Sequence, residues 1–246
     1  MPHFRGRRGK LGDEHETRWQ ICEIGRSMYR SGLVVAREGN LSARLDQDRI
    51  LVTPAGVCKG ELTPQTLLVT DLNGTVRCGA GRPSSEILMH LLFYRLRPDV
   101  KAVCHAHPPT ATGFAAAGRG FDEPVFPEVI MDLGSIPLAP YGTPGTQELC
   151  DSLEPFVAKH DAVLLENHGV VTCGKDLTTA FQRLETVEQF ARILLTAHFL
   201  GGPRMLSRAN VEKLLAAKSF YRTPSPEEVM AVPITTDSSA DKNIVT

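Results

Sequence analysis

Two histidines separated by one residue lie at the end of an apolar run, in the segment Val103-Cys104-His105-Ala106-His107-Pro108. The run predicts a β-strand, and side chains alternate between the two faces of a strand. His105 and His107 therefore project from the same face and can bind one metal ion together, whereas Cys104 points to the opposite face. Two hydrogen-bonded histidines near the surface would give the same pattern, so the pair alone leaves both interpretations open.

A third histidine, His168, follows another apolar segment that predicts a strand, within Leu165-Glu166-Asn167-His168-Gly169. Gly169 is expected to let the backbone turn there. A third imidazole would complete a three-histidine metal site with an open position for a substrate oxygen. Taken alone, His168 also fits a structural histidine in a turn, and Glu166 fits either a residue that orients a ligand or a solvated carboxylate.

The segment Arg82-Pro83-Ser84-Ser85-Glu86 opens a predicted helix and has two interpretations. In the structural interpretation, Ser84 or Ser85 caps the free amides, and the acidic Glu86 stabilises the first turn. In the functional interpretation, Glu86 faces the metal while the serine hydroxyls and the helix amides hold an anion. His90, four positions after Glu86, is interpreted as a packing residue near the same helix face.

The elements that must position these residues follow from apolar periodicity and from Gly and Pro stops. Many short strands alternate with few helices, which predicts an α/β fold with a mixed, largely antiparallel sheet rather than a doubly wound parallel one. The expected helices span residues 17–32, 84–96, 110–117, 146–159, 177–200 and 211–221. The expected strands lie within 37–45, 49–54, 67–74, 75–79, 100–107, 136–140, 162–165 and 170–173.

Composition limits the class of protein. The chain has 246 residues, with 27 basic and 28 acidic side chains, and this balance argues against a dedicated nucleic-acid binder. No apolar run reaches the length of a membrane span, so no membrane partner is expected. The six cysteines are scattered and form no pair of metal-site or disulfide spacing, which predicts reduced thiols and a cytoplasmic location. One domain is expected over residues 17–226, between a flexible basic tail (1–16) and a polar tail (227–246).

Six short motifs in a fixed order resemble the class II aldolase/adducin family, with the pattern of L-fuculose-1-phosphate aldolases as the nearest. Any one of them is weak, but the ordered set covers roughly residues 17–222 and is specific. The motifs are Gly39-Asn40-Leu41-Ser42, VTPAG at 52–56, PSSE at 83–86, CHAHPP at 104–109, APYGTPGT at 139–146 and ENHG at 166–169.

The resemblance implies a three-layer α/β/α domain that assembles as a cyclic homotetramer, with its active sites at the subunit interfaces. It also implies one Zn²⁺ per subunit, or another divalent metal, held by His105, His107 and His168. Glu86 corresponds to a fourth ligand that becomes the acid/base once substrate displaces it. Tyr221 stands at the place of a tyrosine that reaches the neighbouring subunit's site.

The implied phosphate site consists of Asn40, the turn at Ala55 and Gly56, and the two serines Ser84 and Ser85. Two positions depart from the family pattern. Ala55 replaces a threonine, so one hydroxyl donor is missing from the phosphate loop. A second family tyrosine falls at Phe126, which has no hydroxyl to contribute on the aldehyde side of the substrate.

The implied reaction is retro-aldol cleavage of a phosphorylated ketose to dihydroxyacetone phosphate and a short aldehyde. The alternatives on the same metal site are a decarboxylase of a sugar-acid phosphate and a sugar-phosphate dehydratase. Glu86 argues against the ribulose-5-phosphate 4-epimerase branch, where an aspartate is usual. A non-catalytic adducin-like scaffold is disfavoured because all three histidines and Glu86 are present.

Overall fold

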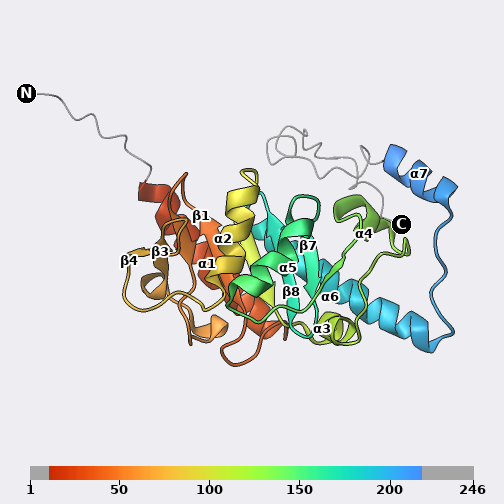
Figure 1. The fold of residues 1–246 in the computed structure, drawn as a ribbon, viewed down its shortest axis with the longest axis horizontal. Helices are drawn as coiled ribbons and strands as arrows, with labels where there is room; N and C mark the ends of the chain where they lie inside the picture. Colours follow the sequence, from red (N-terminus) through yellow and green to blue (C-terminus); the bar gives the residue numbers. More distant parts are fainter. Residues whose placement is uncertain (1–10, 218–246) are drawn as a thin grey trace, which may run out of the picture. The chain divides into compact units, whose positions relative to one another are not determined.

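An eight-stranded sheet forms the centre of the computed structural model, which describes residues 11–217 (Figure 1). Its strand order is β4-β3-β2-β1-β5-β8-β7-β6. Only β6 and β7 pair in parallel, and every other neighbouring pair is antiparallel, so the predicted mixed, largely antiparallel sheet is confirmed. The strands are β1 (Asn40–Arg44), β2 (Ile50–Val52), β3 (Leu68–Thr70), β4 (Val76–Cys78), β5 (Ala102–Ala106), β6 (Leu138–Ala139), β7 (Ala162–Leu165) and β8 (Gly169–Gly174).

Seven α-helices occur in the described part of the chain, and six of them match expected ones. Sequence analysis missed α4, a single short helix after Phe126, and two 3₁₀ turns at Lys59–Glu61 and Pro64–Thr66. The first helix begins at Leu11, six residues before its expected start. The helices are α1 (Leu11–Arg30), α2 (Ile87–Leu96), α3 (Pro109–Ala116), α4 (Pro127–Asp132), α5 (Gln147–Val157), α6 (Leu177–Phe199) and α7 (Arg208–Ala216).

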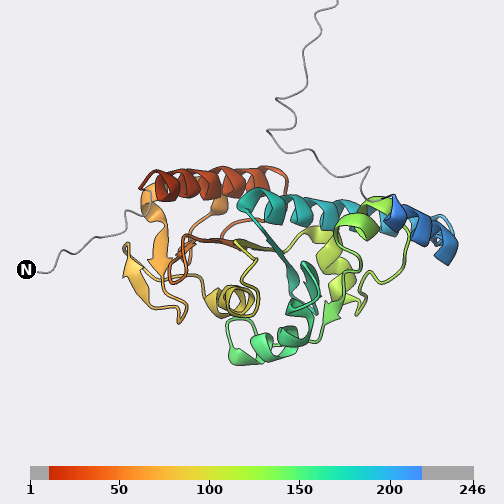
Figure 2. The ribbon, with the colours of Figure 1, turned by 90° about the horizontal axis from the view of Figure 1, so that it is seen from above.

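The helices cover both faces of the sheet and give the expected three layers. Figure 2 shows α1 and α6 along one side of the sheet and α2 and α5 along the other. Two apolar clusters fill the spaces between these layers, one beneath α1, α3 and α6 and one beneath α2 and α5. Cys104 belongs to the first cluster and its neighbour Val103 to the second, as the alternation along β5 predicts.

The first helix shows how the sequence specifies a local structure. Ile21, Ile24 and Met28 recur on one face of α1, and all three are buried. The chain leaves the helix at Gly32, which has a φ of 69°, and the Leu33 amide donates to the Met28 carbonyl at 3.0 Å. Gly32 adopts this left-handed conformation without the steric cost that a Cβ would add, so the predicted stop is confirmed.

A buried carboxylate fixes the segment that follows the two histidines of β5. Glu188, on α6 and only 3% exposed, accepts hydrogen bonds from the amides of Thr110 and Ala111 at the start of α3. Arg192 donates to the same carboxylate at 2.8 Å. These contacts satisfy helix amides that would otherwise lack partners, and they hold α3 directly after the His107-Pro108 turn.

The structure divides into two compact units, one up to Leu206 and one from Ser207 onward, and α7 belongs to the second. The domain limits at 17 and 226 stay a prediction. No helix within residues 11–217 is both long and apolar enough to cross a membrane. None of the six cysteines is in a disulfide: Cys22, Cys104, Cys150 and Cys173 are buried, Cys58 is half-buried and Cys78 is exposed. The cytoplasmic location likewise stays a prediction.

Candidate metal centre

The three histidines singled out in the sequence meet at one point. Their nearest ring nitrogens all lie within 4.8 Å of one another. The Nε2 atoms of His105 and His107 are 3.1 Å apart, and the His168 ring centroid lies 4.7 Å from that of His105. The expectation that the fold brings His168 beside the His-x-His pair is therefore correct.

Backbone contacts select which nitrogen of His105 faces the cluster. Its Nδ1 lies 2.9 Å from the Val170 carbonyl on the neighbouring strand β8. A carbonyl oxygen can only accept, so Nδ1 carries the proton and donates it. Nε2 is thereby aimed at the cluster with its lone pair available when the imidazole is neutral, which is the arrangement found in metal-ligating histidines.

His107 has a carboxylate neighbour that sequence analysis did not single out. Its Nδ1 is 3.6 Å from Oε2 of Glu38, which lies in the loop before β1. That separation is beyond a direct hydrogen bond, so Glu38 acts on His107 only through its charge. The one feature of the sequence that could have indicated Glu38 is its position directly before the Gly39-Asn40 motif.

Two residues with unusual backbone requirements hold His168 and His107 in place. Asn167 has a φ of 54°, so Asn167 and not Gly169 makes the left-handed turn before His168, which corrects the expectation for Gly169. A Cβ on Gly169 would lie 2.5 Å from the Ala106 carbonyl and 2.6 Å from Cδ2 of His107. Gly169 is therefore needed to give the His107 ring its space.

Glu86 faces the histidines rather than its own helix. It is the N-cap residue of α2 but makes no side-chain cap hydrogen bond. Its Oε2 lies 3.2 Å from Nε2 of His105, and its Oε1 lies 2.9 Å from Nε2 of His168. Ser84, one of the two expected caps, accepts from the Glu86 amide at 3.3 Å, whereas the Glu86 carboxylate is turned to the histidines, where the functional interpretation expected it.

Electrostatics within the cluster follow from this placement. Burial alone would raise the pKa of Glu86, but His105 and His168 beside it hold that pKa well below its ordinary value. For His105, burial lowers the pKa, but the charge and hydrogen bond of Glu86, together with the Val170 carbonyl and the Glu38 charge, outweigh it, so the net pKa is raised. Burial together with His105 and His168 lowers the pKa of His107 to about 4. Glu86 is therefore ionised and His107 neutral at ordinary pH.

Asn40 and Ser84 lie beside this carboxylate. The Asn40 side-chain amide donates to Oε2 of Glu86 at 2.9 Å and to Oγ of Ser84 at 3.0 Å. Ser84 Oγ also accepts from the Glu86 amide at 3.3 Å. Because both lone pairs of Ser84 Oγ are thus engaged, its own O–H is left to donate outward. Asn40, by contrast, has committed both of its amide hydrogens.

The other predicted phosphate-site residues are exposed beside this group. Ser85 is exposed, and so are Ala55 and Gly56 in the turn after β2. The Ala55 amide already donates to the Arg82 carbonyl at 2.9 Å, so in this conformation it cannot also bind a phosphate. Gly56 has a φ of 74° and open space around the position of a Cβ, which leaves its backbone accessible.

Three further expectations have different outcomes. Tyr221 lies outside the described residues, so its role stays a prediction. Phe126 packs its ring against Phe190 of α6, with centroids 5.6 Å apart, and is part of the apolar cluster beneath that helix. Glu166 is half-buried and accepts from the Tyr141 amide at 2.9 Å, so its observed hydrogen bond is to the backbone and not to a histidine.

Comparison with known proteins identifies a family whose sequence pattern this chain matches. Residues 19–195 match the family described as Class II Aldolase and Adducin N-terminal domain. This match covers more than two thirds of the sequence. The chain belongs to the class II aldolase/adducin family. It is therefore related to a superfamily of metal-dependent enzymes, and a sugar phosphate substrate is consistent with its membership.

Individual relatives carry two different activities in their names. A 3-oxo-tetronate 4-phosphate decarboxylase from Pectobacterium atrosepticum is 34% identical over 78% of this chain and 89% of its own length. A 5-deoxy-D-ribulose 1-phosphate aldolase from Bacillus thuringiensis is 34% identical over 83% of this chain and 95% of its own. A solved L-fuculose 1-phosphate aldolase superposes with a TM-score of 0.76 at 30% identity, covering 84% of this chain and 97% of that one.

The side chains present fit a divalent metal ion. Three imidazole nitrogens lie within 4.8 Å of one another and the Glu86 carboxylate contacts two of these rings, a donor set that suits Zn²⁺ and similar ions. The 3.1 Å contact between two imidazole Nε2 atoms needs a proton or a cation between them, because two facing lone pairs repel. A metal ion would meet that need for His105, His107 and His168 at once.

Proposed function

We propose that this chain is a Zn²⁺-dependent aldolase that cleaves a phosphorylated ketose of the L-fuculose 1-phosphate kind. The products would be dihydroxyacetone phosphate and a short aldehyde such as lactaldehyde. The observation that carries the proposal is the Glu86 carboxylate, which lies between His105 and His168 and is turned away from the amides of its own helix. Relatives named as ketose-1-phosphate aldolases support the substrate class.

His105, His107 and His168 would hold the metal, with Glu86 as a fourth ligand until substrate takes its place. The bound metal would supply Lewis acidity to the oxygens that gain negative charge when the carbon–carbon bond breaks. No lysine is then needed to activate the carbonyl as a Schiff base. The deeply buried Lys59 donates only to the Arg37 and Val57 carbonyls, so it is a structural residue.

The remaining chemistry falls to side chains of this chain. Cleavage of the C3–C4 bond leaves an enediolate, and Glu86 in its carboxylic acid form would return a proton to C3. In the synthesis direction, Glu86 in its carboxylate form would remove that proton. The outward O–H of Ser84 would donate to the phosphate, next to Ser85 and the exposed backbone of Gly56. Tyr221 would transfer the proton at the C4 oxygen. Binding of the phosphate orients the carbon chain for these steps.

A decarboxylase of a 4-phosphorylated 3-oxo sugar acid is the second candidate. Relatives of that name are 34% and 36% identical to this chain. The chain also has Phe126 in place of a family tyrosine, and its ring is packed against Phe190. Loss of CO₂ involves no aldehyde oxygen whose proton must be moved, so the missing tyrosine hydroxyl hinders decarboxylation less than aldol cleavage. Both reactions would share the same enolate and the same Glu86.

The test is a direct product assay of zinc-loaded protein against both substrate classes. We expect L-fuculose 1-phosphate or a related ketose 1-phosphate to give dihydroxyacetone phosphate at least tenfold faster than any 3-oxo-tetronate 4-phosphate gives CO₂. The opposite ratio would establish the decarboxylase instead. If zinc-loaded, folded protein forms neither dihydroxyacetone phosphate nor CO₂, both candidates are overturned.

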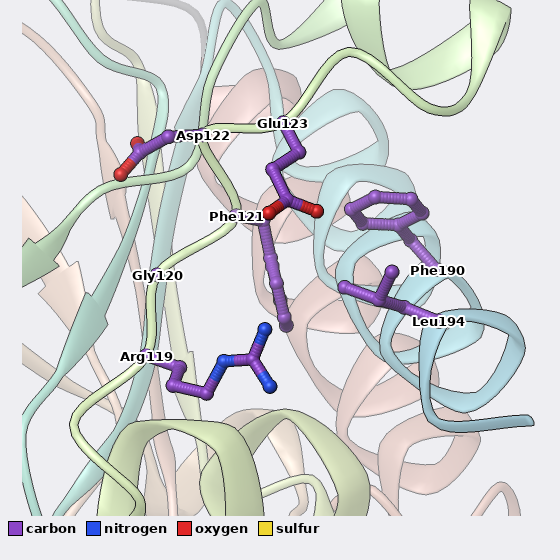
Figure 3. A pocket seen from close by; sticks show the side chains of 7 residues that line it. All are labelled: Arg119, Gly120, Phe121, Asp122, Glu123, Phe190 and Leu194. Atoms are coloured by element: carbon purple, nitrogen blue, oxygen red, sulfur yellow. The ribbon is translucent and has the colours of Figure 1, made fainter. Parts of the chain in front are cut away.

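We also propose that the chain assembles as a homotetramer with its active sites shared between subunits. Apolar side chains gather at the C-terminal end of α6, where Phe199 is 83% exposed and Leu200 is 82% exposed. Further toward the start of α6, Phe190 and Leu194 line a cavity of about 250 Å³ opposite Arg119, Phe121 and Glu123 (Figure 3). Exposed apolar surface of this kind is typical of an interface between subunits.

Charge placed on this apolar end should dissociate the assembly. For the double variant Phe199→Asp, Leu200→Asp we expect light scattering to give the mass of one 26.9 kDa chain, against about four times that mass for the unaltered protein. Gln189→Asp, an exposed change on the same helix, is the control and should leave the mass unchanged. A monomeric unaltered protein with full activity would contradict the proposal.

A further inference from the structure

A continuous chain of buried polar groups runs from the interior of α2 to the metal centre. Tyr94 Oη lies 2.8 Å from Ser42 Oγ, and Ser42 Oγ lies 2.6 Å from Nδ1 of His90. His90 Nε2 contacts Oδ1 of Asn40, whose amide nitrogen is 2.9 Å from Oε2 of Glu86. All five side chains are at most 8% exposed, and His90 and Tyr94 are each 2% exposed.

Each hydrogen bond in this series of buried groups has a defined donor and acceptor. Burial, assisted by the positive charge of His105, lowers the pKa of His90 to about 3, so the imidazole is neutral and carries a single proton. The Glu86 carboxylate can only accept, so Asn40 turns its NH₂ group to Glu86 and its Oδ1 to His90. Oδ1 also can only accept, so the His90 proton is on Nε2. Nδ1 must then accept from the Ser42 hydroxyl, and Ser42 in turn accepts from Tyr94, whose pKa is raised by burial.

The Nε2–H of His90 stabilises this orientation of the Asn40 amide. With Nε2–H of His90 on its oxygen, Asn40 presents its NH₂ group to both Ser84 and Glu86. In the flipped amide, the oxygen would face the Glu86 carboxylate and the NH₂ group would face the Nε2–H of His90. Both contacts would be repulsive in a site with little water, where polar mismatches are costly.

The sequence positions of the five hydrogen-bonded side chains place them together specifically. Glu86, His90 and Tyr94 recur at four-residue intervals along α2, and Asn40 and Ser42 occupy alternate positions of β1 on the face opposite them. The packing between α2 and the sheet is otherwise mainly apolar, apart from Arg44 of β1, which donates to the Tyr94 carbonyl and lies over the Tyr94 ring. A small cavity of about 10 Å³ lies beside these groups, bordered by Asn40, Ser42, Ser84 and His90, and has room for about one water.

We propose that His90 is a positioning residue that sets the amide orientation of Asn40 and thereby the orientation of the Glu86 carboxylate and the Ser84 hydroxyl. The inference rests on the proposed function, because it assigns to Glu86 and Ser84 the roles given above. His90 itself touches neither substrate nor metal. Its contribution acts through Asn40, so its loss should change the reaction rate more than metal binding.

The first test is magnetic resonance of the metal-free protein and does not depend on activity. Long-range ¹H–¹⁵N spectra should show a neutral His90 with protonated Nε2 and unprotonated Nδ1. The side-chain NH₂ protons of Asn40 should exchange slowly with solvent, and His90→Phe should speed that exchange at least tenfold. A proton on Nδ1 of His90, or unchanged Asn40 exchange in His90→Phe, would overturn the proposal whatever reaction the protein performs.

The second test separates positioning from general destabilisation. We expect His90→Phe to lower kcat about 10- to 100-fold, the usual effect of removing a group that orients a ligand, with zinc content unchanged. Tyr94→Phe should cost less, since the Ser42 hydroxyl can still donate to Nδ1 of His90. Met89→Leu, an apolar change at a buried position of the same helix, should keep the full rate. Equal losses in His90→Phe and Met89→Leu would assign His90 a structural role only.

If the unaltered protein catalyses neither proposed reaction, the proposed function fails while the inference about Asn40 is still judged by the resonance experiment. If the protein is active and His90→Phe keeps its kcat, the inference fails and the proposed function stands. His90→Gln gives a further check, because its amide can donate to Oδ1 of Asn40. Partial recovery of kcat relative to His90→Phe is expected, and a His90→Gln rate no higher than that of His90→Phe would count against the hydrogen bond.

Discussion

Replacing His107 with alanine is expected to remove the metal and reduce activity at least about 10³-fold without unfolding the chain. Loss of one of three imidazoles leaves the site without a complete ligand set, and metal stabilisation of developing charge supplies several kcal/mol to such reactions. His107 suits this test better than His105, because its side chain is 26% exposed while that of His105 is fully buried. Truncation at 107 therefore leaves a gap that water can fill.

The measurement is the zinc content per chain after dialysis, together with the rate of product formation and the denaturant midpoint of unfolding. His160→Ala provides the matched control, since the His160 ring lies beside the Ser135 carbonyl, at 3.3 Å, and the Phe156 ring, and is not part of the three-histidine cluster. It should retain full metal and full rate. Full metal occupancy in a double variant lacking both His105 and His107 side chains would show that the ion is held elsewhere.

The fold was accessible from sequence wherever one element carries its own pattern. The stripe of Ile21, Ile24 and Met28 specifies α1, and its end at Gly32 is a local backbone requirement. The alternation of Val103 and Cys104 between two cores was likewise readable along β5. By contrast, α4 has only six residues, and its packing against α6 through Val129 depends on tertiary contacts rather than on a repeating pattern.

The site was accessible only in part, for a similar reason. The same-face geometry of His105 and His107 follows from strand alternation, but only the pairing of β5 with β8 and the turn at Asn167 bring His168 beside them. The role of Gly169 was misread, since the clash of a Cβ with the His107 ring cannot be seen along one strand. The partner of His90 was invisible as well, because it lies on a different element fifty residues earlier.

Glu86 shows how two interpretations of one motif are separated by geometry. A glutamate at the start of a helix stabilises the free amides by roughly 0.3–1 kcal/mol, and such a residue would turn its carboxylate toward them. Glu86 instead directs one carboxylate oxygen to His105 and the other to His168, and Asn40 holds it there. The cost of burying this charge is offset by those three partners, so a purely structural helix-start role does not account for its position.

Glu86→Gln should therefore keep the fold and most of the metal but lower the catalytic rate by roughly 10²–10⁴, the usual effect of removing a general acid or base. Glutamine has the same shape but cannot accept a proton at neutral pH, and three histidines remain to hold the ion. The measurement is exchange of deuterium into C3 of dihydroxyacetone phosphate, which reports the proton step without the correct aldehyde. Glu185→Gln, an exposed change on α6 that removes the same charge, should exchange at the unaltered rate. Exchange at that rate in Glu86→Gln would exclude Glu86 as the base, and no exchange in the unaltered, metal-loaded protein would point to a reaction that does not pass through the C2–C3 enediolate.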